Sequence, residues 1–487
     1  MKRSAFLAAA ATVVSSSIVS AQGPDFIATA AETILNTSST QVMTTTGPVT
    51  VTGGVFYFNS VTIPAGKVVR GVGPNPMIWV VNSMRVDGIL SADGQDGTRV
   101  NTLQSANFAK PGGLGGPAGG NGGSGTPNIT MQSFTGAAGS GPGNTPGFGG
   151  GGGLLSFVTG CGRGSGGGGG SFATAGDPWF HSQASGGTSF LQRRGFGGLG
   201  CVGGSGAASR TLLPGAAGPV IFQDAQLDNN FFGFGYNFAT QQLIAGELQS
   251  LVGGAGGGGG GDLSSDDTLL SANWAMDASG GGGGGGGGCL VIAAQTDIEV
   301  GDIGRISANG GHGGGGEQAG SCNRGAGGGG GSGGLVILAA RGQIVLNVHG
   351  ETYANNDYDF ILSADGGVCA TSFLPPIIPA KYPVSGQPTM SGTFYDQRPL
   401  GGFGGMGIVQ LATRPGTNLD NTNTVLDDNI VVVRNGLTLA GSEKQRFLAW
   451  RGFANQSGQG LDDSGNVIVI GNNEGDIRPT PILLPVF

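Results

Sequence analysis

The sequence has few charged residues and almost no histidine. Asp, Glu, Lys and Arg together make up 11% of the chain, and the histidines are His181, His312 and His349. The formal net charge is −8 and the cations are not clustered, which argues against nucleic acid, because phosphate backbones are bound by grouped Lys and Arg. No G-x-S-x-G nucleophile elbow on a strand-to-helix turn supports a Ser-His-Asp hydrolase either.

Acidic pairs are the remaining enzymatic signal, since polysaccharide-cleaving enzymes use two acids across a cleft. The candidates are Asp262 with Asp266 and Asp267, Asp357 with Asp359, Asp427 with Asp428, and Asp462 with Asp463. All of them lie in polar, turn-like surroundings, and neither an EF-hand loop nor a glycine–aspartate nonapeptide repeat accompanies them. We therefore predict a protein with no catalytic residues, no cofactor and no bound metal, and keep a polysaccharide-acting enzyme as an alternative.

Long hydrophobic runs are missing too. No segment has the roughly 20 unbroken apolar residues of a membrane helix, so we expect a protein that is not integral to a membrane. Residues 1–21 begin with Lys2 and Arg3, continue with a short apolar stretch and end in Val-Ser-Ala, which is typical of a cleavable export signal. We expect a secreted, extracellular or cell-surface location.

Cysteine is sparse, and no C-x-x-C spacing is present to suggest a zinc or redox site. In an oxidising compartment disulfides are the natural interpretation. Cys161 and Cys201 lie in similar glycine-rich surroundings, so we expect these two to pair. An odd total of five leaves one unpaired or shared between chains, and Cys322 has Cys369 or Cys289 as its candidate partner.

Glycine is what the chain has in excess: 106 of its 487 residues, against about 7% in average proteins. Uninterrupted tracts occupy residues 166–170, 256–261, 280–288 and 327–331. One interpretation is a set of flexible loops, because ordering glycine backbone is entropically costly. The other is extended polyglycine helices with three residues per turn, which pack side by side and satisfy each other's N–H and C=O groups.

An imperfect internal repeat organises these tracts. ILSADG at 89–94, ISANGG at 306–311 and ILSADGG at 361–367 each follow an apolar run, at 77–81, 289–294 and 335–340. A fourth run at 404–412 lacks the closing half. Short runs of Val, Ile and Leu predict buried strands, and the Asp-Gly and Asn-Gly pairs predict turns. We predict an all-β fold, a β-solenoid of stacked strands with glycine-rich, polyglycine II tracts; a β-sandwich with long glycine loops is the alternative.

The chain divides by composition into four parts. Residues 1–21 are the signal peptide, 22–110 a β cap with the first repeat, 111–428 the glycine-rich repeat region with aromatic inserts, and 429–487 a β cap at the C-terminal end. Strand, turn and strand are expected over 61–71, and strands over 430–433, 437–439 and 467–470. The apolar spacing at 243–251 predicts a short helix.

Aromatic residues offer candidate partner contacts. We expect Trp79, which lies within an apolar run, to be a core residue. Outside the repeats, Trp179, Phe180, Phe231, Phe232 and Tyr236 either anchor their segments or contact a partner, since loops carry binding more often than cores do.

The segments VTIPAGKVVRGVGPNPMIWVVNSMRVDGILSADGQDG (61–97), DNNFFGFGYN (228–237), LIAGELQSLVGGAGGGGGG (243–261) and GGLVILAA (333–340) carry a resemblance. Over most of residues 50–415 the chain looks like large glycine-rich secreted proteins of bacteria. The resemblance implies a cell-envelope or extracellular setting and transfers no catalytic or binding residue.

The function predicted from the sequence is that of a secreted or cell-surface structural or adhesive protein. Its expected partners are other copies of itself, or polysaccharide of the cell envelope or extracellular matrix. A surface- or ice-binding protein is a further alternative, although the sequence has few regularly spaced threonines.

Overall fold

The computed structural model describes 21 stretches of the chain. They are residues 23–99, 110–126, 136–146, 149–152, 166–172, 180–181, 232–237, 242–246, 248, 250–261, 279–316, 318–319, 323–324, 326–348, 361–367, 399–402, 404–405, 407–413, 429–440, 459–461 and 467–469, with the shorter gaps between them left out.

The described chain is built of strands. Its only helical element within these ranges is a short 3-10 turn, η1 (Pro142–Asn144), so the predicted all-β class is confirmed. The strands expected at 289–294, 335–340 and 430–433 are present, and the one expected at 77–81 continues to Val86. The strands at 289–294 and 335–340 begin where an apolar run directly follows glycine, and all four consist mainly of the β-branched and apolar residues that favour strands.

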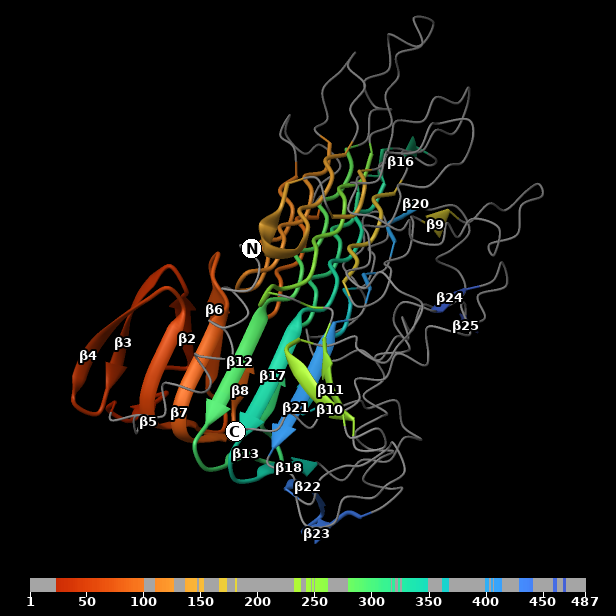
Figure 1. Ribbon diagram of the computed structural model, residues 1–487. Helices are drawn as coiled ribbons and strands as arrows, with labels where there is room; N and C mark the ends of the chain where they lie inside the picture. Colours follow the sequence, from red (N-terminus) through yellow and green to blue (C-terminus); the bar gives the residue numbers. More distant parts are fainter. Residues whose placement is uncertain are drawn as a thin grey trace, which may run out of the picture.

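The largest sheet has ten strands and curls like half a barrel (Figure 1). Its strands are β1 (Phe26–Ile27), β5 (Val55–Ile63), β7 (Met77–Val86), β12 (Cys289–Ala294), β13 (Ile298–Val300), β17 (Leu335–Ala340), β18 (Ile344–Val348), β21 (Ile408–Thr413), β22 (Ile430–Arg434) and β23 (Leu437–Thr438). All neighbours pair in parallel except β22 and β23, whose antiparallel pairing makes the sheet mixed. The β22–β23 turn contains Asn435 and Gly436, both at positive φ, as a tight hairpin requires.

A second sheet of five parallel strands faces the same core. It has the order β19 (Leu362–Ser363), β14 (Arg305–Ser307), β8 (Ile89–Ser91), β6 (Val68–Val72) and β2 (Glu32–Asn36). Equivalent repeat positions are in register, because Ser307 pairs with both Ser91 and Ser363. The repeat seen in the sequence is therefore a repeat of strand positions.

Five antiparallel pairs complete the described strands. They are β3 (Ser39–Thr44) with β4 (Gly47–Thr52), β9 (Phe180–His181) with β20 (Pro399–Leu400), β10 (Phe234–Asn237) with β11 (Gln242–Ala245), β15 (Gln318–Ala319) with β16 (Asn323–Arg324), and β24 (Gln459–Leu461) with β25 (Val467–Val469). In the hairpin of β3 and β4, the side chains of Val42 and Val51 point into the main core.

The main core contains an aromatic group at its N-terminal end and aliphatic residues further along. Trp79 is fully buried and its ring centroid lies 4.8 Å from that of Phe56. Along the sheet the Trp79 position is occupied in register by Ile292, Leu338 and Leu411. The prediction that Trp79 is a core residue is confirmed.

Two local predictions are wrong. The helix expected over 243–251 is not formed, because Gln242–Ala245 is the strand β11 and pairs with β10; the apolar spacing did not reveal that partner. The turns expected at the repeated Asp-Gly and Asn-Gly pairs are also absent, since residues 92–95, 308–311 and 364–367 form no turn. Asp93, Asn309 and Asp365 do not have positive φ either. The chain instead continues into extended glycine tracts.

Candidate functional site

The most distinctive feature of the structure is a bundle of glycine tracts beside the strands (Figure 1). The tract 280–288 lies at its centre and donates backbone hydrogen bonds to three neighbours in turn, so that every third N–H group reaches the same neighbour. These bonds, of 2.6–3.0 Å, run from Gly281, Gly284 and Gly287 to Ala326, Gly329 and Ser332; from Gly282, Gly285 and Gly288 to Thr98, Gln95 and Ala92; and from Gly283 and Gly286 to Gly123 and Gly120.

The carbonyl groups of the same tract are used in the same way. They accept N–H groups from the tracts 253–261, 308–316 and 110–117, again at a spacing of three residues. The central tract therefore has a hydrogen-bonded neighbour on every side, which satisfies its buried backbone without any side chain. The four glycine tracts singled out in the sequence all lie in this bundle, so the flexible-loop interpretation does not apply to them.

The close spacing of the tracts explains why they are glycine. A Cβ atom added at any position from 280 to 287 would lie closer than 3.0 Å to a backbone oxygen of another tract, a distance that real Cβ atoms do not show. Neighbouring backbone cannot move aside as a flexible side chain can, because it is held by its own hydrogen bonds. Any side chain in this tract would push the bundle apart.

The tracts alternate in direction, so their far ends lie together. The chain leaves the strands after Ser91, Ser307 and Ser363, and returns to them at β12, β17 and β21. At the opposite end, Gly280 donates to the hydroxyl of Thr126, and Gly282 to the carbonyl of Thr98. Figure 1 shows this end of the bundle on the side away from the strand arrows.

A buried polar ladder joins the second sheet to the bundle. The Asp93 carboxylate accepts the hydroxyls of Ser91 and Ser307 at 2.8 and 2.9 Å, and the backbone N–H of Asn309 at 2.6 Å. The amide oxygen of Asn309 accepts the backbone N–H of Asp365 at 2.8 Å. The side chains of Asp93 and Asn309 thus each bind the backbone of the following repeat.

A second hydrophobic cluster covers the outer face of the largest sheet. Phe172 and Leu248 pack there against Cys289, Leu335 and other outward residues of β12, β17 and β21. Phe232 packs against this cluster and is half-buried. Its backbone is held by Gln410, whose amide accepts the Phe232 N–H at 2.9 Å and donates to the Phe232 carbonyl at 3.1 Å. Phe232 is thereby placed as an anchor of its segment.

The other predicted contact residues are only partly described. Phe180 lies in β9 opposite Leu400, and Tyr236 lies in β10 opposite Leu243. Trp179 and Phe231 lie outside the described residues, as do all the candidate acid pairs: Asp262, Asp266, Asp267, Asp357, Asp359, Asp427, Asp428, Asp462 and Asp463. The structure does not bring the predicted aromatic residues together as one described site.

The predicted disulfide also falls outside the described part of the chain. Cys161, Cys201, Cys322 and Cys369 all lie outside it. Cys289 is a free, fully buried thiol at the start of β12, so the suggested pairing of Cys289 with Cys322 is wrong. Burial raises the pKa of the Cys289 thiol far above its usual range, which makes it a poor nucleophile.

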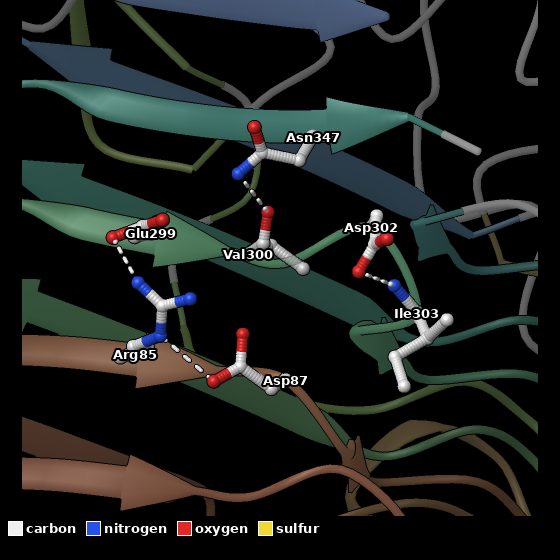
Figure 2. A network of polar contacts seen from close by, with 7 residues as sticks. All are labelled: Arg85, Asp87, Glu299, Val300, Asp302, Ile303 and Asn347. Carbon is white, nitrogen blue, oxygen red and sulfur yellow. Dashed lines mark hydrogen bonds and ion pairs between the residues drawn. The ribbon is translucent and has the colours of Figure 1, made fainter. Parts of the chain in front are cut away.

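Charged side chains tie successive strands together on the outside (Figure 2). Arg85 on β7 contacts Asp87 at 2.7 Å and Glu299 on β13 at 2.8 Å. The hydrogen bond to Asp87 is the main reason that the pKa of Arg85 is raised. Asn347 extends the network by donating to the Val300 carbonyl at 3.0 Å. These exposed ion pairs are worth about 0–1 kcal/mol each, so they align strands more than they stabilise the fold.

The described part of the chain contains no group of three or more His, Cys, Asp or Glu side chains arranged to hold a metal ion. Within the same ranges no helix has the length and apolarity that a membrane span requires. A comparison of the chain with protein-family models, with curated proteins and with solved structures found no match.

Two sets of residues are not anticipated by the sequence patterns described above. The first set is the polar ladder, whose signal in the sequence is the repeated Ser-Ala-Asp/Asn. The Asp and Asn of this repeat were expected to form turns. The second signal was the set of Gly-Gly pairs that separate Pro111, Leu114 and Pro117, and then Ala118, Asn121 and Ser124. Each of these two segments has a period of three residues. That period distinguishes the outer tracts from the uninterrupted central one.

Proposed function

We propose that this chain is a secreted or cell-surface protein with a structural or adhesive role and no catalytic activity. In this proposal the repeated parallel strands form a β-solenoid, and the glycine tracts form a polyglycine II bundle attached to it. The observation that carries the proposal is the central tract 280–288, which is hydrogen-bonded to neighbouring tracts on all sides.

The rigidity of the bundle supports this proposal. A lattice in which each tract is held by several others cannot bend one tract without breaking bonds to its neighbours. The polar ladder and the continuous strands transmit this stiffness into the apolar core. Such a body suits a load-bearing or presenting role, because the far ends of the tracts lie together at one end of the bundle.

The adhesive role is tested with the purified chain and defined polysaccharides. Insoluble peptidoglycan, cellulose and chitin are each incubated with the protein, and the bound fraction is measured after sedimentation. We expect retention on at least one of them, with no release of reducing ends. A variant with Gly284→Ala, which disturbs the central tract, should bind less well, whereas Leu114→Ala, at an exposed position, should bind like the native chain.

Two outcomes would contradict the proposal. Steady release of reducing ends from a polysaccharide would favour the solenoid enzyme instead. Failure to bind any of the three, combined with the absence of self-association, would leave no support for an adhesive or matrix role.

A further inference from the structure

The outer tracts of the bundle carry side chains at every third residue. In 110–117 these are Pro111, Leu114 and Pro117, and in 118–126 they include Asn121 and Ser124, with two glycines between successive positions. Pro111 and Leu114 are exposed, Leu114 to 56%. Because such a tract makes one turn in about three residues, side chains at this spacing project from one side of it.

At the outer tracts of the bundle, side-chain oxygens accept hydrogen bonds from backbone N–H groups. Asn121 Oδ1 accepts the N–H of Gly115 at 2.9 Å, and Asn144 Oδ1 accepts the N–H of Asn121 at 3.2 Å. Asp96 Oδ1 accepts the N–H of His312 at 2.9 Å. In the centre of the bundle the equivalent donors are taken by carbonyl groups of the next tract.

We propose that these side chains set the width of the bundle and prevent a glycine tract of a second copy of this chain from adding to it. The spacing within the bundle supports this: an interior Cβ would collide with the neighbouring tract. For the same reason, a Cβ on the outer side holds an incoming tract away. The side-chain oxygens then satisfy donors that such a tract would otherwise bind.

The device corresponds to the protection of edge strands in β-sheets. An unprotected edge is a template for another chain, and natural proteins blunt it with side chains that obstruct or occupy the backbone groups. A glycine bundle has such edges around its whole circumference. The inference rests on the hydrogen-bonded bundle and not on the adhesive role, so the two can fail separately.

The test is to remove the outer side chains. A variant with Pro111→Gly, Leu114→Gly, Asn121→Gly and Ser124→Gly is compared with a control carrying Pro111→Ala, Leu114→Ala, Asn121→Asp and Ser124→Ala, which keeps each Cβ and the Asn121 acceptor. Sedimentation velocity is measured over a hundredfold range of protein concentration. We expect the average mass of the glycine variant to rise at least twofold with concentration, above both the native chain and the control.

A glycine variant that is folded, by circular dichroism, and sediments like the native chain would overturn the proposal. If that variant does not fold, hydrogen exchange on the single variant Asn121→Ala decides. The Gly115 amide should then exchange at least tenfold faster, while the amides of Gly113 and Gly116, which donate to the central tract, keep their native rates. An unchanged Gly115 rate would refute the capping role of Asn121.

Discussion

The Asp93 carboxylate accepts the backbone N–H of Asn309 at 2.6 Å, although 216 positions of sequence separate the two residues. The bond lies where β8 and β14 end and their glycine tracts begin. Asp93 is only 7% exposed and also accepts the hydroxyls of Ser91 and Ser307. One buried acid therefore connects successive repeats at the junction between the strands and the bundle.

Replacing Asp93 should lower the stability of the protein. Asp93→Ala leaves buried donors without an acceptor, at about 1–3 kcal/mol for each group, and we expect the free energy of unfolding to fall by about 2–4 kcal/mol in total. Urea denaturation followed by circular dichroism measures the change. Asp93→Asn, which keeps one acceptor oxygen, should lose less, and the exposed Asp302→Ala should change little. Equal stability of Asp93→Ala and the native chain would show that the ladder is not stabilising.

Gly284 provides a test of packing in the bundle. An alanine Cβ there would collide with the carbonyl of Gly311. Alanine lowers the conformational entropy of the unfolded chain, which by itself would stabilise the folded protein by about 0.4–1 kcal/mol. Overpacking in the folded bundle costs more, roughly 1–3 kcal/mol. We expect Gly284→Ala to lower the melting temperature, and Leu114→Ala, at a position that already carries a side chain, to leave it nearly unchanged. A Gly284→Ala variant that melts with the native chain would argue against a close-packed bundle.

Asp25 should make stability depend on acid pH. Its carboxylate accepts the Ser60 hydroxyl at 2.7 Å and the Asn59 amide at 2.9 Å, and these bonds, that to Ser60 first, hold its pKa below the usual range. The resulting stabilisation is present above the unfolded-state pKa of about 3.9 and is lost as pH falls through the lower folded-state pKa.

The comparison is between native protein and Asp25→Asn. Melting temperatures measured from pH 6 to pH 2 should differ most at pH 6 and converge at the acid end. A difference that stays constant over the whole range would mean that ionisation of Asp25 does not contribute.

The Cys289 thiol should not react with alkylating reagents in the native protein. It is fully buried and its pKa is raised by desolvation, so little thiolate forms near neutral pH. Alkylation with iodoacetamide at pH 8, followed by peptide mass spectrometry, should modify Cys289 only after denaturation. Labelling of Cys289 at the same rate in native and unfolded protein would contradict the buried position at the start of β12.

Much of the strand content could be predicted from the sequence. The runs at 289–294 and 335–340 are uninterrupted apolar segments that follow glycine, and both became strands with the same register. The segment at 243–245 was misjudged because its apolar spacing suits a helix as well as a strand. Its antiparallel partner β10 decides between them, and that is a tertiary effect.

The site was less predictable. A period of three residues is visible in the sequence from Pro111 to Pro117 and again from Ala118 to Ser124, and it could have indicated two outer tracts. The pairing of Asp93 with Asn309 could not, because it depends on how distant repeats stack. The same holds for Asn121, whose amide reaches Gly115 only through the antiparallel arrangement of two tracts.

The assignment of every third N–H group to one neighbour constrains how the length of a tract can change. Removing one residue from 280–288 would rotate each following donor by a third of a turn, so that it faced a different tract. Removing three residues would shorten the tract, but every remaining N–H group would still face the same neighbouring tract. Insertions and deletions within the bundle should therefore be tolerated in multiples of three, much as a reading frame tolerates them in a gene.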